Sequence, residues 1–195
     1  MIVIGIAGKM GTGKTTVSNH LIDSLPGNWK KLAFGDLLKE EVSEIYGVPK
    51  PWTYEHKDYL FTMPLECNPP KERMMIREIL QWHGTEVRRA QDPHYWVEKL
   101  ADKILDHREL DGVVIDDARF PDEANLVLEF KEHLLIRLGV YRGWKCGVKI
   151  ARHSSETALD GYLKFDRHLY PSFGKLEGAA DLIVRDIEAK FLETV

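Results

Sequence analysis

Short apolar runs alternate along this chain with longer segments in which apolar residues recur every three or four positions. Residues 2–7, IVIGIA, are continuously apolar and rich in β-branched side chains, which is typical of a strand buried on both faces. Residues 14–25 follow with helical spacing and stop at Pro26 and Gly27. The same alternation predicts further strands at 30–34, 112–116, 133–140 and 181–186, and further helices at 37–47, 74–84, 92–107, 121–133 and 187–195.

Apolar strands that alternate with helices indicate an α/β fold, in which a parallel sheet carries helices on both faces. Two stretches lack a regular pattern: 48–72, rich in proline and aromatic residues and predicted to be a binding loop, and 141–178. Asp36 is predicted to cap the helix over 37–47. Because ligands bind at the carboxyl ends of parallel strands, functional residues are expected in 8–16, 34–39, 116–119 and 139–153.

Composition narrows the class of protein. Of the 195 residues, 44% are hydrophobic and 30% are charged, as in an ordinary domain with a sizeable core. The formal net charge of −4 argues against a general basic surface for a nucleic acid polymer. Two scattered cysteines, Cys67 and Cys146, favour a reducing cytoplasm. The apolar start is too short for a signal peptide and no stretch could cross a bilayer, so no membrane partner is expected.

The segment after the first strand, residues 8–15, reads GKMGTGKT and matches the phosphate-loop pattern G-x-x-x-x-G-K-[ST] at every fixed position. Lys14 is placed to reach the β- and γ-phosphates of ATP, and the Thr15 hydroxyl to ligate Mg²⁺. A glycine-rich turn with a chance lysine is the alternative, but a strand before the loop and a helix after it favour the nucleotide. The residues predicted to bind the ATP phosphates are Gly8, Gly11, Thr12, Gly13, Lys14, Thr15 and Thr16.

A second acidic strand end occurs in GVVIDDAR, residues 112–119. A carboxylate that follows a buried strand can hold the metal of a bound nucleotide. Successive strand residues point to opposite faces, so Asp116 and Asp117 are expected to have different roles. We expect Asp116 to help place the metal with Thr15, and Asp117 to face the second substrate. The alternative is a solvated acidic turn that caps the next helix.

Residues outside the phosphate loop help to distinguish between the classes of protein that contain such a loop. No guanine-reading N-K-x-D stretch is present, which argues against a GTPase switch. A kinase with a phosphorylated acceptor must neutralise both substrates and the transferring group. For any single cation, a solvated helix face is the alternative reading. The cations spread over several segments are Lys39, Arg73, Arg77, Arg88, Arg89, Arg119, Arg142 and Arg152.

Four ordered blocks give the chain a family resemblance over most of its length. They are LAFGDLLKEEVSEIYGV at 32–48, REILQWHGTE at 77–86 followed by YWV at 95–97, DDARFPDE at 116–123, and HSSETAL at 153–159. With these blocks the chain resembles the deoxynucleoside monophosphate kinases of tailed bacteriophages. Two departures are Thr15, where those enzymes often carry Asp, and a shorter chain.

The resemblance implies a P-loop NTPase-type kinase that transfers phosphate from ATP, with Mg²⁺, to a deoxynucleoside monophosphate. It implies catalytic roles for Lys14, Asp117 and Arg119, with Arg142 and Arg152 as lid arginines. Trp96 would stack on the acceptor base, although a core tryptophan is an equal alternative. The acceptor site implied by the resemblance consists of Lys39, Arg77, Gly84, Thr85, Trp96, Asp117, Arg119 and Glu156.

The expected organisation is a single kinase domain over 1–195, with mobile segments for the acceptor at about 36–97 and for a lid at about 141–165. Two alternatives stay open at this point: a kinase of another phosphorylated small molecule, of the phosphomevalonate or dephospho-coenzyme A type, and a regulatory ATP-binding switch. The expected partners are ATP and the acceptor, in the cytoplasm (of the host, if phage-encoded), with a homodimer left open.

Overall fold

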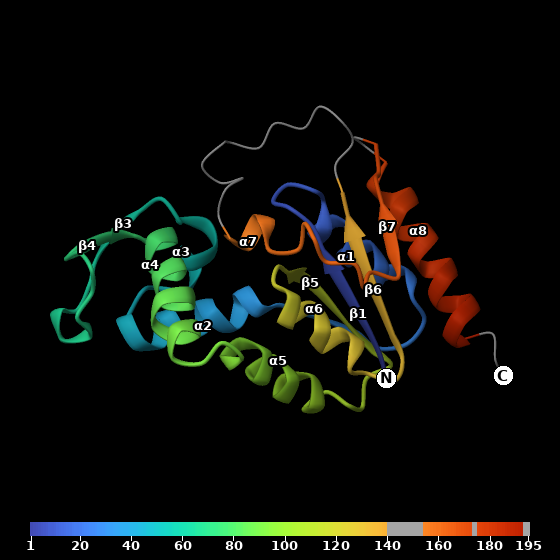
Figure 1. Ribbon diagram of the computed structural model, residues 1–195, viewed down its shortest axis with the longest axis horizontal. Coiled ribbons are helices and arrows are strands. Elements are labelled where there is room, and N and C mark those ends of the chain that lie inside the picture. The colour runs from blue at the N-terminus through green and yellow to red at the C-terminus, as the bar shows by residue number, and fades with distance from the viewer. Residues whose placement is uncertain (140–153, 173–174, 193–195) are drawn as a thin grey trace. The chain divides into compact units, whose positions relative to one another are not determined.

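The computed structural model describes residues 1–139, 154–172 and 175–192 (Figure 1). The chain divides into two compact units. The first, called here the sheet unit, consists of Met1–Ala33 with Ala101–Val195. The second, called the helical unit, is Phe34–Leu100 and includes the segment 36–97 that is expected to bind the acceptor.

Five parallel strands form the sheet of the sheet unit, in the order β2-β5-β1-β6-β7. The central strand β1 pairs with β5 on one side, where Ile4 lies opposite Val114, and with β6 on the other, where Ile4 lies opposite Leu134. The predicted parallel α/β sheet is therefore confirmed. The strands are β1 (Ile2–Ala7), β2 (Trp29–Leu32), β5 (Gly112–Ala118), β6 (His133–Leu138) and β7 (Arg167–Leu169).

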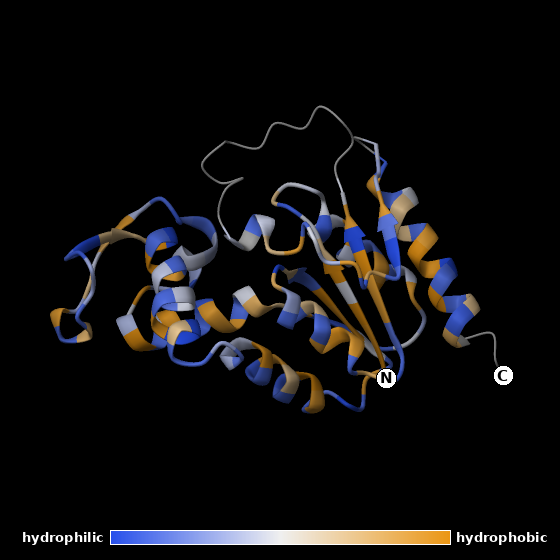
Figure 2. Cartoon of the chain, viewed as in Figure 1, coloured by the Kyte–Doolittle hydropathy of each residue, from blue (hydrophilic) through white to orange (hydrophobic). Residues whose placement is uncertain are grey.

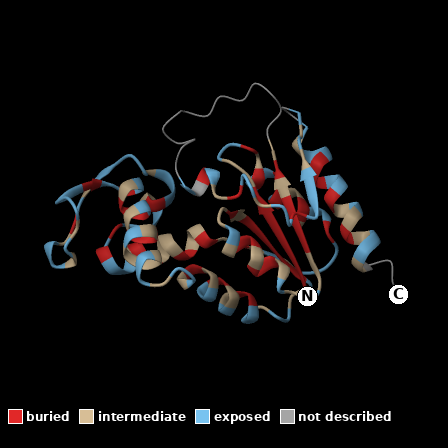
Figure 3. Cartoon of the chain, viewed as in Figure 1, coloured by how far each residue is buried: buried red, intermediate tan, exposed pale blue. Residues whose placement is uncertain are grey.

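Helices cover both faces of this sheet because β1 is apolar at every position. Every residue of β1 is buried, as Figure 3 shows in red. Ile2, Ile4 and Ile6 belong to a core cluster with α1 (Lys14–Ser24) and α8 (Leu176–Ile187). On the opposite face, a side chain at Gly5 would lie 2.7 Å from Val127 of α6 (Pro121–Leu128). The sheet is thus the middle of three layers.

The segment 181–186 is part of helix α8, so its prediction as a last strand was wrong. Buried residues of α8 recur at helical spacing, with Ala180, Ile183 and Ile187 packed in the core beside α1. Figure 2 shows hydrophobic and hydrophilic residues alternating along the helix. A π-helix, η4 (Glu188–Leu192), follows where a separate closing helix was predicted. The stretch 141–178 is also not wholly irregular, because α7 (Ser154–Thr157) and β7 lie within it.

The helical unit packs its elements around a core that includes Val42, Met63, Met74, Ile76 and Ile79. The stretch 48–72 is not a plain loop: it folds into a short helix and one strand of an antiparallel hairpin. The elements are α2 (Phe34–Tyr46), α3 (Lys50–Glu55), β3 (Leu60–Thr62), the 3₁₀ helix η1 (Leu65–Cys67), β4 (Arg73–Met75), α4 (Ile76–Gln81), the π-helix η2 (Trp82–Arg89) and α5 (Tyr95–Leu105), which continues into the sheet unit.

Helix α2 begins at Phe34, three residues earlier than predicted, so Asp36 lies in its first turn rather than at its N-cap. The Asp36 carboxylate accepts hydrogen bonds from Lys39 and Tyr54 instead. None of the helices in the described part of the chain is long and apolar enough to span a membrane.

Candidate functional site

The phosphate loop joins β1 to α1. Gly13 stands at the N-cap of α1 with φ 87°, a left-handed conformation that glycine adopts without a steric penalty. A side chain at Gly8 would lie 2.5 Å from the carbonyl oxygen of Leu138 on β6. No side chain caps the first turn of α1. The N–H groups at this helix end are therefore available to an anion.

Lys14 is a buried cation, only 8% exposed, at the start of α1. Its Nζ donates hydrogen bonds to the carbonyl oxygens of Gly8 and Lys9, at 2.8 and 3.0 Å. Within the described residues it forms no ion pair with a carboxylate. Burial, followed by the nearby charge of Arg119, lowers the pKa of Lys14 to about 8. The loop thus holds a positive charge that two neutral carbonyl groups solvate and that no carboxylate among the described residues pairs with directly; Glu156, Asp116 and Asp117 act on it without an ion pair.

The remaining loop side chains fit a bound phosphate group. Thr12 Oγ1 is buried and, among the described residues, has no hydrogen-bond partner, although buried hydroxyls almost always have one. Thr15 and Thr16 are exposed in the first turn of α1. A phosphate oxygen would give the Thr12 hydroxyl its missing acceptor and Lys14 its missing counter-charge.

Asp116 and Asp117 lie at the carboxyl end of β5, beside the loop. Asp116 is buried, and its Oδ2 accepts a hydrogen bond of 3.0 Å from Ser18 Oγ on α1 and lies 3.8 Å from Lys31 Nζ. The neighbouring Asp117 is half-buried and points to the other face of the strand. Both carboxylates lie close enough to Lys14 to raise its pKa, against the larger effect of burial.

The described residues contain no cluster of three or more His, Cys, Asp or Glu side chains that could hold a metal unaided. Magnesium is usually bound by one or two carboxylates together with substrate phosphates and water. Asp116 and the Thr15 hydroxyl supply oxygen ligands of that kind. The donor set therefore fits Mg²⁺ delivered with a nucleotide rather than a resident metal.

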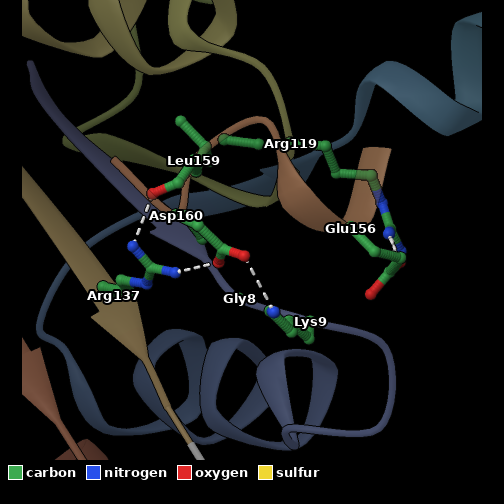
Figure 4. A pocket seen from close by; sticks show the side chains of 9 residues that line it. Gly8, Lys9, Arg119, Arg137, Glu156, Leu159 and Asp160 are labelled. Carbon is green, nitrogen blue, oxygen red and sulfur yellow. Dashed lines mark hydrogen bonds and ion pairs between the residues drawn. The ribbon is translucent and has the colours of Figure 1, made fainter. Parts of the chain in front are cut away.

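A pocket of about 270 Å³, including its open mouth, lies where β1, β5 and β6 end (Figure 4). Three cations border it: Lys9 from the phosphate loop, Arg119 after β5 and Arg137 from β6. Arg137 was missed by the sequence reasoning, although a single arginine in the apolar run HLLIRL was a usable signal. The lining residues are Ala7, Gly8, Lys9, Ala118, Arg119, Arg137, Glu156, Leu159 and Asp160.

Two carboxylates from α7 and the turn after it balance these cations. Glu156 pairs with Arg119 and accepts a hydrogen bond of 2.7 Å from the backbone N–H of Met10 in the phosphate loop. Asp160 bridges Lys9 and Arg137, at 3.0 and 2.7 Å (Figure 4). The structure thus brings together Arg119 and Glu156, two of the predicted acceptor residues, at the mouth of the phosphate loop.

The acceptor residues predicted in the helical unit are engaged with their own neighbours. Lys39 pairs with Asp36 at 2.9 Å, and Arg77 is exposed and pairs with Asp58. Thr85 donates its hydroxyl hydrogen to the backbone carbonyl of Gln81 in the preceding turn. Their roles toward an acceptor stay predictions.

Gly84 and Trp96 lie together in the core of the helical unit. Trp96 is 3% exposed, and its Nε1–H donates to the carbonyl oxygen of Gly84 at 3.1 Å. Its ring makes edge contacts with His83 and Tyr95. In this structure Trp96 has the surroundings of a core tryptophan, the alternative stated for it, and stacking on a base stays a prediction. Arg142 and Arg152 lie outside the described residues.

Comparison with known proteins finds several kinases to which this chain is similar. No family model matches the chain. A curated protein of Acanthamoeba polyphaga mimivirus, described as "Putative deoxynucleotide monophosphate kinase", is 29% identical over 150 residues, which cover 69% of this chain and 72% of that protein. Among solved structures, shikimate kinase from Aquifex aeolicus is similar at 15% identity and TM-score 0.48, over 97% of this chain and 98% of that one. Shikimate kinase from Acinetobacter baumannii is similar at 14% identity and TM-score 0.47, over 98% and 94%.

Proposed function

We propose that this protein is a P-loop kinase that transfers the γ-phosphoryl group of ATP, as its Mg²⁺ complex, to a deoxynucleoside monophosphate. The main support for this proposal is the buried charge of Lys14, which pairs with no carboxylate among the described residues. The neighbouring pocket is bordered by two further cations, Arg119 and Arg137. A buried cation of this kind is suited to charge that arrives with a substrate and shifts during transfer. The similarity to the mimivirus protein supports a nucleotide as the acceptor.

The proposed roles follow from position. Lys14 stabilises the transferring group, Asp116 and Thr15 place the magnesium, and Asp117 and Arg119 serve the acceptor. An oxygen of the acceptor phosphate attacks the γ-phosphorus while the bond to the β–γ bridging oxygen breaks. That acceptor oxygen is already anionic near neutral pH, so no general base is required. Arg142 and Arg152 are proposed as lid arginines on the family resemblance.

The experiment is an acceptor panel with coupled detection of ADP. We expect dGMP, dTMP, dAMP and dCMP to be phosphorylated, with kcat/KM about tenfold or more above that of the matching ribonucleotides. A preference of that size corresponds to about 1.4 kcal/mol, within the range for burying an unpaired hydroxyl. Equal rates for ribo and deoxy acceptors would remove the sugar preference and leave the kinase.

Two other functions are outcomes of the same panel. Turnover only with phosphomevalonate or dephospho-coenzyme A would keep the kinase and replace its acceptor. ATP hydrolysis at an unchanged rate with and without every acceptor would favour a regulatory switch. A kinase of the proposed kind is nearly silent until its acceptor is added.

A further inference from the structure

Glu41 is a buried carboxylate on which four side chains of the helical unit converge. It is 5% exposed and lies in the middle of α2. Tyr95 O–H and Lys99 Nζ donate to its Oε2, each at 2.6 Å. His83 Nε2 lies 2.9 Å from its Oε1, and Arg88 Nε donates to the same oxygen. An ionised carboxylate with this many donors is strongly favoured over the protonated acid.

The buried side of this group is neutral. Because ionised Glu41 can only accept, His83 Nε2 carries the hydrogen and its Nδ1 accepts from Tyr46 O–H, at 2.7 Å. Burial lowers the pKa of His83, which keeps the ring uncharged at neutral pH. Tyr46, His83 and Glu41 therefore form a chain of hydrogen bonds that fixes the carboxylate from behind.

The solvent side carries more positive charge than Glu41 needs. Arg88 and Lys99 contribute two positive charges against one negative charge, and their side chains are 27% and 44% exposed above a carboxylate that is not. A purely structural ion pair would be complete with one of them. The second cation leaves a net positive charge at the surface, where an anion can approach it.

The Arg88 guanidinium is held to Glu41 through its Nε. Among the described residues, the only hydrogen bond of its side chain runs from Nε to Glu41, and the two NH₂ groups donate to no acceptor there. The guanidinium lies over the ring of Tyr95, with Cζ 4.8 Å from the ring centroid. Lys99 Nζ lies 5.1 Å from the same centroid. The outer edge of a guanidinium fixed at Nε is the part that binds two phosphate oxygens at once.

Arg88 also occupies an unusual piece of backbone. It lies near the end of η2, an eight-residue π-helix. π-Helical turns are rare and occur frequently at functional sites. In this chain the π-helix carries both His83 and Arg88, so one backbone feature delivers two of the four groups to Glu41.

We propose that Glu41 is a positioning residue and that Arg88 and Lys99, which it holds, bind the phosphate group of the kinase's acceptor. The identity of the acceptor rests on the proposed function; the anion subsite itself does not, since inorganic phosphate can probe it directly. Glu41 contacts neither substrate and acts only by fixing the two cations.

The first test follows the Nε–Hε resonance of Arg88 in ¹H–¹⁵N spectra of the full chain during titration with inorganic phosphate. We expect a saturable shift in the wild type and in Glu40→Gln, a matched change at the neighbouring carboxylate, which pairs with Lys50 on the surface. In Glu41→Gln the resonance should move toward the value of a free arginine and the apparent Kd for phosphate should rise at least fivefold. An Arg88 resonance that does not respond to phosphate in the wild type overturns the subsite.

The second test is kinetic and uses whichever acceptor the panel identifies. Arg88→Lys keeps a cation on the partly exposed edge but loses the Nε anchor and the planar fork. We expect Glu41→Gln and Arg88→Lys to raise the acceptor KM about tenfold, with the KM for ATP within twofold of wild type. Equal losses for ATP and acceptor, or a lower melting temperature with an unchanged acceptor KM, would mean that Glu41 only ties the fold together. Failure of the proposed function is a separate result, read from the wild-type panel alone.

Discussion

Lys14 of the sheet unit and Glu41 of the helical unit are both buried charges, but they differ in the number and kind of groups that contact them. Two backbone carbonyls hold Lys14, and no carboxylate among the described residues pairs with it. Four side chains surround Glu41, two of them cationic. Burial lowers the pKa of Lys14 to about 8, whereas the hydrogen bonds to Glu41 outweigh its burial and lower its pKa to about 2.

The two arrangements suit an anionic substrate in different ways. In the phosphate loop no carboxylate among the described residues pairs with Lys14, and in the proposed function the phosphates of ATP supply its counter-charge. The helical unit surrounds Glu41 with two cations and two neutral donors, and in the proposed subsite the carboxylate fixes those two cations for an anion. One site is built from backbone and a single lysine, and the other from side chains that hold one another. Substitutions at the two sites should therefore have different main effects: loss of phosphoryl transfer at Lys14 and loss of stability at Glu41.

The largest effect is expected from Lys14→Ala, which removes the uncompensated charge. Phosphoryl transfer should fall by about 10²–10³-fold or more, the range for losing one electrostatic stabiliser of a transition state. The melting temperature should not fall, because the variant removes a buried charge that pairs with no carboxylate among the described residues. Lys30→Ala, at an exposed lysine whose Nζ lies 2.8 Å from His107 Nε2, is the control and should leave turnover unchanged. Near wild-type turnover in Lys14→Ala would falsify the role.

The second effect concerns stability in acid and belongs to Glu41. Its folded-state pKa of about 2 lies below the ordinary value of 4.5, so its ion pairs stabilise the fold above about pH 4.5. This contribution is lost as the pH falls toward 2. At pH 7 we expect Glu41→Gln to lower the free energy of unfolding by about 3 kcal/mol, as when a buried ion pair is broken. Urea titrations of both proteins at pH 7 and pH 3 should show this gap closing; a gap independent of pH would contradict it.

The two sites also differ in how far their residues are separated along the chain. The phosphate loop was predicted from eight consecutive residues, because its glycines and lysine act through local backbone. The partners of Glu41 are 42 to 58 positions away in the sequence, so no local sequence pattern predicts them. The strand wrongly predicted at 181–186 has a related cause, since a short apolar run does not separate a buried strand from a buried helix. The sequence thus predicted four of the five strands of the sheet and the loop after β1, whereas β7 and the partners of Glu41 depend on contacts between distant parts of the chain.

The third effect is on the pH dependence of catalysis. With a pKa of about 8 in the free enzyme, Lys14 loses its charge above that pH. We expect kcat/KM for ATP to fall by about tenfold per pH unit above pH 8, since this parameter reports groups of the free enzyme. Saturating ATP brings phosphate charges to Lys14 and should keep kcat level over the same range. Parallel profiles for kcat and kcat/KM would place the titrating group elsewhere.

The fourth prediction separates the neighbouring carboxylates of the sheet unit. Asp116→Asn should raise the Mg²⁺ concentration for half-maximal rate several-fold, because Asp116 faces Ser18 on the helix that follows the phosphate loop. Asp117→Asn should instead raise the acceptor KM. Magnesium and acceptor titrations of both variants give the answer. Superimposable titration curves for the two variants would show that Asp116 and Asp117 do not have separate roles.

The smallest effect is expected from Tyr46→Phe, which trims the chain behind Glu41. The substitution removes one buried hydrogen bond, from Tyr46 O–H to His83 Nδ1, and leaves the carboxylate and its cations in place. A loss of about 1 kcal/mol in the free energy of unfolding is expected. Because His83 stays neutral and still donates to Glu41, the acceptor KM should change by less than twofold. A tenfold rise would show that the position of Arg88 depends on the whole hydrogen-bond chain, and an unchanged stability would show that this hydrogen bond contributes nothing measurable.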